Sequence, residues 1–115
     1  MDHSKVYRNL NFLLYLKDVA ISVRRNLILN MTSGQIEAIA AIAARIITGV
    51  INPLRRDAQL FERKRVLLRT LASSRVTSAR KKSLLRRHHA IVPVLLRIRY
   101  MIRTILDEIQ TVREA

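Results

Sequence analysis

The residues in this sequence best able to do chemistry are its basic side chains. The 115 residues include 22 Lys and Arg against 8 Asp and Glu, which gives a formal net charge of +14. Of the basic residues 17 are Arg, whose guanidinium group binds two phosphate oxygens at once, whereas the Lys ammonium acts as a point charge. This excess predicts a polyanionic partner, and phosphate fits better than carboxylate.

The positive charge is concentrated in the second half of the chain. Between positions 53 and 103 there are 15 basic residues, and Asp57 and Glu62 are the only acidic ones. Because a solvated surface normally mixes both signs, this segregation favours a binding face. The sequence predicts that nucleic acid is bound by Arg55, Arg56, Arg63, Lys64, Arg65, Arg69, Arg75, Arg80, Lys81, Lys82, Arg86 and Arg87.

The expected partner is duplex DNA, contacted through its phosphates. Proteins that bind single strands stack bases on aromatic side chains, and here Tyr100 is the only aromatic residue near the basic half that lies outside an apolar helix pattern. Residues 62–89 can be read as a helix-turn-helix. Its second helix has no Asn or Gln, so binding or condensation largely independent of base sequence is preferred.

The sequence offers few parts for a catalytic or metal site. Its carboxylates are scattered, and His88 and His89 are adjacent, so on a helix they diverge by about 100°. There is no cysteine, and Gly34 and Gly49 stand alone, which excludes a glycine-rich phosphate loop. We therefore predict no enzyme activity, catalytic residue, metal, cofactor or small-molecule substrate.

The elements that must position the basic residues are expected to be helices. Two Gly, two Pro and 4% aromatic residues are typical of an all-α protein. The length and the absence of a linker predict one domain over residues 1–115, with a nearly neutral apolar half (1–52) and a basic half (53–115). The expected architecture is a compact bundle of four to five helices.

Several local signals mark the ends of these helices. A first helix is expected over about residues 5–29, and a third helix from Pro53 to about residue 72. Thr32 and Gln35 form a capping-box pattern for the second helix, which should stop at Gly49. Thr77 should cap a fourth, short helix over residues 78–88.

The last helix carries a heptad pattern of apolar residues. This seam could pack within the protomer, which is slightly favoured, or against another copy of the chain. It consists of Ile91, Leu95, Ile98, Ile102, Ile105, Ile109 and Val112.

No segment is expected to span a membrane, because Arg45 interrupts the most apolar region, residues 36–54. Two other functions remain open. One is a structural capsid or scaffold protein whose basic face meets an acidic protein surface, and the other is a membrane-active protein that uses residues 91–112 as an amphipathic helix.

Two stretches of the sequence, QIEAIAAIAARIITGVI and LLRTLASSRVTSARKKSLLRR, carry a resemblance. They resemble small basic proteins encoded by polinton-like and adintovirus-like elements, over about half of the chain. The positions that fit are Gln35, Ile36, Glu37, Ala38, Ile39, Gly49, Leu71, Ala72, Val76, Thr77, Lys81, Lys82, Leu84 and Leu85.

The resemblance implies a virion-associated protein that packages double-stranded DNA or lines the capsid interior, located in the virion or the nucleus. Capsid protein and further copies of the chain would then be partners. Where that family often continues into a Gly-Gly-Phe apolar tail, this sequence has His88, His89 and Ala90 before Ile91. The departure weakens the inference of a flexible or membrane-active tail.

Overall fold

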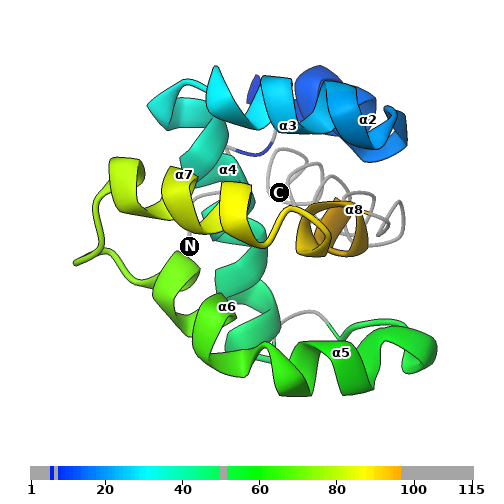
Figure 1. Cartoon of the computed structure of the whole chain (residues 1–115). Coiled ribbons are helices and arrows are strands. Elements are labelled where there is room, and N and C mark those ends of the chain that lie inside the picture. Colours follow the sequence, from blue (N-terminus) through cyan, green and yellow to red (C-terminus); the bar gives the residue numbers. More distant parts are fainter. Residues whose placement is uncertain (1–5, 7, 50–51, 97–115) are drawn as a thin grey trace, which may run out of the picture.

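The computed structural model describes residue 6 and residues 8–49 and 52–96, and in these parts every regular element is a helix (Figure 1). The all-α prediction is therefore confirmed, although seven α-helices are described where four to five were expected. The elements are α2 (Leu10–Asp18), α3 (Ile21–Leu29), α4 (Ser33–Ile47), the 3-10 helix η1 (Arg55–Asp57), α5 (Ala58–Arg63), α6 (Arg65–Ala72), α7 (Ser78–Arg87) and α8 (Ile91–Leu96).

Helix α4 is the central element, and its ends follow the local signals in the sequence. The backbone N–H of Gln35 donates to Thr32 Oγ1 at 3.2 Å, and the backbone N–H of Thr32 donates to Gln35 Oε1 at 3.0 Å, which completes the predicted capping box. After the helix, Gly49 has a φ of 75°, a conformation that favours glycine. Helices α2, α6, α7 and α8 all pack against α4.

The first predicted helix is two helices, so a continuous helix over residues 5–29 was wrong. Val19 and Ala20 are extended, with ψ angles of 158° and 154°, and they separate α2 from α3. The two helices have different partners, since α2 packs against α8 and α3 packs against α7 (Figure 1). One straight helix could not contact both α7 and α8. Because of the break, Leu16 of α2 and Ile28 of α3 are both buried in the same hydrophobic core.

The third predicted helix is also interrupted. Within its predicted range there is no helix before Arg55, η1 forms a 3-10 turn at Arg55–Asp57, and Lys64, with φ −101° and ψ 18°, separates α5 from α6. Helix α6 packs along α4 through Leu68 and Leu71, whereas α5 contributes one buried residue, Phe61. The break lets α6 follow α4 while α5 extends to the side (Figure 1).

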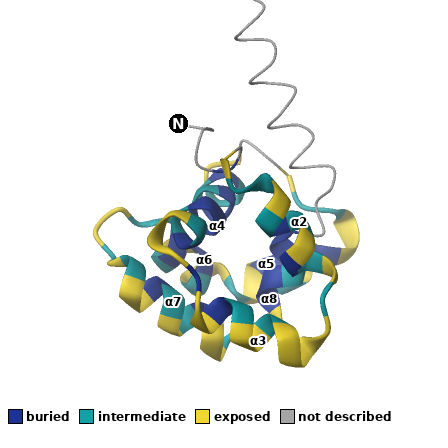
Figure 2. Ribbon diagram, turned by 90° about the horizontal axis from the view of Figure 1, so that it is seen from above, coloured by how far each residue is buried: buried dark blue, intermediate teal, exposed yellow. Residues whose placement is uncertain are grey.

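Helix α7 agrees with the prediction to within a residue, and α8 begins at Ile91, the first residue of the predicted seam, so that Pro93 lies within its first turn. The backbone N–H of Arg80 donates to Thr77 Oγ1 at 3.2 Å, so Thr77 caps α7 as expected. Every residue of α8 except Pro93 is buried, and α8 contacts α2 and α4 within the same chain. Ile91 and Leu95, the first two seam residues, therefore belong to the core. Figure 2 colours the helices by burial and shows where α8 lies among them. The rest of the predicted seam, Ile98, Ile102, Ile105, Ile109 and Val112, lies outside the described residues.

Among the described helices, none alone is long and apolar enough to cross a membrane. Helices α3 and α4 together reach that length and composition, but the pair is bent by 113°.

Candidate nucleic-acid interface

Helix α7 presents a basic face to solvent. Arg80, Ser83 and Arg87 are exposed and recur at i, i+3 and i+7, so they form one stripe along the helix. The exposed Arg86 and the partly buried Lys82 lie beside this stripe, both on the same side of it. Helix α7 thus exposes three arginines, Arg80, Arg86 and Arg87, around the part of its surface that faces away from the core.

Lys81 does not belong to this face, which corrects its assignment as a phosphate contact. Its side chain is 2% exposed, and its Nζ lies 3.0 Å from Oε2 and 3.2 Å from Oε1 of Glu37 on α4. The hydroxyl of Ser78 donates to Glu37 Oε1 at 2.9 Å. Lys81 precedes the buried Leu85 by four residues, and this spacing places both side chains on the inner face of the helix. The prediction assigned Lys81 to the basic run of residues and did not use this spacing.

The other predicted contacts are spread over several segments of the basic half. Lys64, at the junction of α5 and α6, is partly buried, and Arg65 forms an exposed ion pair of 3.5 Å with Glu62, a type of pair that contributes little stability. The remaining residues are exposed on η1, α5, α6 and the connection between α6 and α7: Arg55, Arg56, Arg63, Arg69 and Arg75.

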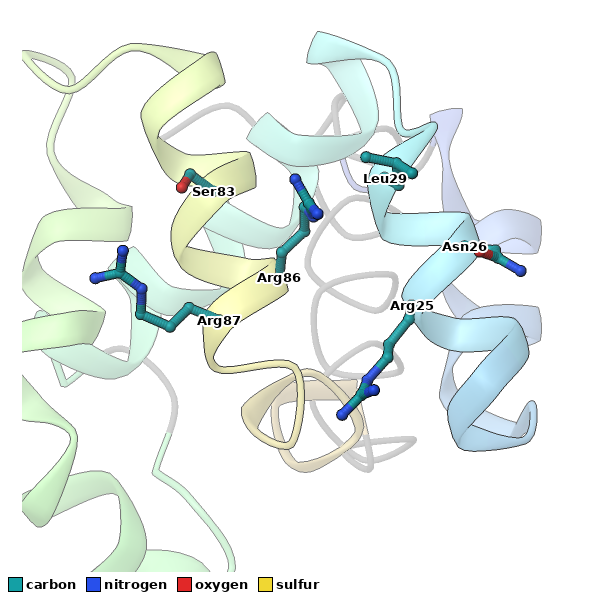
Figure 3. Close-up of a pocket in the computed structure, with 6 residues that line it drawn as sticks. All are labelled: Arg25, Asn26, Leu29, Ser83, Arg86 and Arg87. Carbon is teal, nitrogen blue, oxygen red and sulfur yellow. The ribbon is translucent and has the colours of Figure 1, made fainter.

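A groove of about 440 Å³ runs between α3 and α7, and arginine side chains line it (Figure 3). No carboxylate is among its lining residues, which are Arg25, Asn26 and Leu29 of α3 and Ser83, Arg86 and Arg87 of α7. Sequence reasoning assigned no role to Arg25, because it lies in the nearly neutral half and no sequence pattern places it beside α7.

His89 in the α7–α8 connection holds Arg25 in position. Nε of Arg25 donates to His89 Nε2 at 3.3 Å, and Arg25 Nη2 lies 3.2 Å from the same nitrogen. Burial lowers the pKa of His89 from its usual 6.5, and the positive charges of Arg25 and Arg24 lower this pKa further. The imidazole is therefore neutral at pH 7 and serves as an acceptor at Nε2.

A second, smaller hollow adjoins His89 on the side of α5 and α6. Its volume is about 230 Å³, and Arg87 lines both this hollow and the groove. The lining residues again include no carboxylate, and they are Leu60, Lys64, Arg87, His88, His89, Ala90 and Ile91. The structure thus brings Lys64, predicted from the sequence, next to Arg87, which lies 23 positions later.

Comparisons of the chain with protein-family models, with curated proteins and with solved structures found no match. Within the described parts of the chain, no three His, Cys, Asp or Glu residues are grouped so that they could hold a metal ion.

Proposed function

We propose that this protein binds duplex nucleic acid, with DNA favoured, by contacting its phosphates largely independently of base sequence and without catalysing a reaction. One observation carries the proposal: α7 exposes Arg80, Arg86 and Arg87 on its outer side, while Glu37 and the core hold its inner side. An exposed row of guanidinium groups on a fixed helix is suited to phosphate oxygens.

The dimensions of α7 also suit a duplex. A helix of ten residues is about 15 Å long, and the DNA major groove is about 12 Å wide, so α7 can lie in the groove or across its edge. Helix α7 has no Asn or Gln to pair with adenine. Contacts to phosphate, rather than to base edges, are then the main source of affinity.

The resemblance to proteins of polinton-like and adintovirus-like elements extends the proposal to packaging of a DNA genome in a virion. A capsid-associated protein with an acidic protein partner is the alternative from another class. Membrane activity of residues 91–112 is less favoured, because Ile91 and Leu95 are already buried in the core.

The proposal is tested by measuring affinity for a duplex of random sequence at about 50 and about 200 mM salt. With about six phosphate contacts, affinity should fall by roughly three orders of magnitude over this range. Gln retains good helix propensity, so replacing Arg80 and Arg87 by Gln should leave the helix intact and weaken binding roughly ten- to thirtyfold. The slope of log affinity against log salt concentration should decrease by the amount expected for the loss of about two phosphate contacts.

The matched control removes two positive charges from the nearly neutral half with Arg8→Gln and Lys17→Gln, since neither residue is among the predicted contacts. We expect this variant to lose much less affinity. Equal losses in both variants would indicate diffuse attraction without a defined site on α7, and a flat salt response of the unaltered protein would contradict phosphate binding altogether.

A further inference from the structure

We propose that the groove between α3 and α7 is a phosphate-binding site, in which Arg25 and Arg86 hold a phosphate group between two helices. The inference rests on the proposed function in one respect, since it takes the backbone of a bound nucleic acid as the expected source of that phosphate. It adds a helix from the nearly neutral half of the chain to the interface.

The residues that line the groove are the first line of evidence for a phosphate site. Arg25, Arg86 and Arg87 contribute guanidinium donors, and Asn26 and Ser83 contribute neutral ones, so that Leu29 is the only apolar lining residue. Cations gathered in a concave space without a neighbouring carboxylate repel one another, and an anion between them relieves this repulsion. The donors and the charge both fit phosphate.

The directions of the arginine side chains are the second line of evidence. In Figure 3, Arg86 extends from α7 toward the end of the groove at Leu29, and Arg25 extends from α3 toward the connection between α7 and α8. Arg87 points to the other side of α7, toward α6. Arg25 and Arg86 therefore flank the groove from opposite helices, and Arg87 connects it with the second hollow.

The contact between Arg25 and His89 is the third line of evidence. Arg25 uses Nε and Nη2 for His89, and a guanidinium group has five N–H donors, so further donors remain for a ligand. The acceptor is a neutral imidazole, which orients the guanidinium but leaves its positive charge uncompensated. A cation held in place in this way loses less conformational entropy when it binds an anion.

The decisive experiment compares Arg25→Gln with Arg8→Gln, since each variant removes one exposed charge from the nearly neutral half of the chain and Arg8 is not among the predicted contacts. Affinity for duplex DNA is measured by fluorescence anisotropy, and affinity for inorganic tripolyphosphate is measured by calorimetry on the full chain. Circular dichroism checks that each variant is folded. We expect Arg25→Gln to weaken binding of both probes roughly tenfold, and Arg8→Gln to weaken it about twofold or less.

A second variant, Arg25→Lys, separates the guanidinium geometry from the charge. It retains the charge but loses the planar fork, so it should fall between Arg25→Gln and the unaltered protein. A selective loss of DNA binding in Arg25→Gln assigns the phosphate to the nucleic-acid backbone. A selective loss of tripolyphosphate binding assigns it to a free polyphosphate, and the site stands in either case.

The inference fails if Arg25→Gln behaves like Arg8→Gln toward both probes. It also fails if Arg25→Gln does not fold and Arg25→Lys, folded, binds both probes as tightly as the unaltered protein. If DNA binding then still depends on Arg80 and Arg87, the proposed function survives without the groove. If the unaltered protein does not bind DNA, the proposed function fails, and tripolyphosphate alone decides whether the groove binds phosphate.

Discussion

At the scale of single residues, we expect His89 to make the stability of the fold depend on pH. The charged groups that the described residues place near it are cationic: Arg24 and Arg25 come from α3, and Lys64 and Arg87 line the adjoining hollow. His88 also lines this hollow. In the folded state burial, Arg25 and Arg24 lower the pKa of His89 below its ordinary value of 6.5. The unfolded chain therefore binds a proton at His89 more readily than the folded chain does.

This difference predicts that the free energy of unfolding decreases as the pH falls below about 7 toward the lowered pKa of His89. His89→Gln should reduce this loss, because the Gln carbonyl can accept from Arg25 and does not titrate. The measurement is the thermal midpoint, Tm, at several pH values between about 7.5 and 5.5, a range above most carboxylate titrations. His88→Gln is the matched control and should retain the pH dependence. If the pH dependence of His89→Gln equals that of the unaltered protein, the coupling through His89 is refuted.

At the scale of elements, the Glu37–Lys81 ion pair fixes α7 against α4. Lys81 is almost fully buried, whereas the Glu37 side chain is 26% exposed, so the two partners are not equivalent. Glu37→Gln leaves a buried ammonium group without a carboxylate and should destabilise the fold by about 3 kcal/mol. Lys81→Met should cost less, because water can reach the remaining carboxylate.

Urea denaturation of the two variants and of the double variant Glu37→Gln/Lys81→Met measures these costs. The double variant should be more stable than Glu37→Gln alone, because its buried ammonium group is gone. If Lys81→Met keeps its stability but loses as much DNA affinity as a variant of the exposed Arg80, then Lys81 is a phosphate contact and not an anchor.

The elements also show how far sequence reasoning reaches. The ends of α4 and the start of α7 were predictable, because Thr32, Gln35, Gly49 and Thr77 act within one turn of chain. The breaks after α2 and at Lys64 were not, because they depend on which distant helices α2, α3 and α6 pack against. Local signals fix helix ends, whereas tertiary packing decides whether a long periodic segment remains one helix.

The same distinction holds for the candidate site. The outer face of α7 was visible in the sequence as a run of basic residues, and most of that run is exposed as expected. The groove was not visible, because it requires Arg25 and Arg86, 61 positions apart, to line one space. Lys81 lies four residues before the buried Leu85, and this helical spacing indicates a buried position. Its positive charge indicates an exposed position, and the prediction followed the charge.

At the scale of the whole molecule, the fold carries a large unbalanced charge. The described residues include 17 Lys and Arg but only 4 Asp and Glu, and three of these acids, Asp18, Glu37 and Glu62, already form ion pairs. The folded state brings these cations closer together than the unfolded chain does, so their mutual repulsion opposes folding. Salt and polyanions should both relieve this repulsion, by different routes.

We therefore expect salt to act in opposite directions on folding and on binding. Raising the salt concentration from about 10 to about 100 mM shortens the screening length from about 30 to about 10 Å, which should raise Tm of the free protein by several degrees. Over the same range, affinity for DNA should fall.

Duplex DNA at a hundred times its Kd should add about 2.7 kcal/mol to the free energy of unfolding, and this gain should disappear as the salt concentration rises. The Arg80→Gln/Arg87→Gln variant, with less self-repulsion, should show a smaller rise of Tm with salt. A Tm of the free protein that stays constant or falls with salt would mean that the folded surface is not self-repelling, and that its cations are already neutralised within the fold.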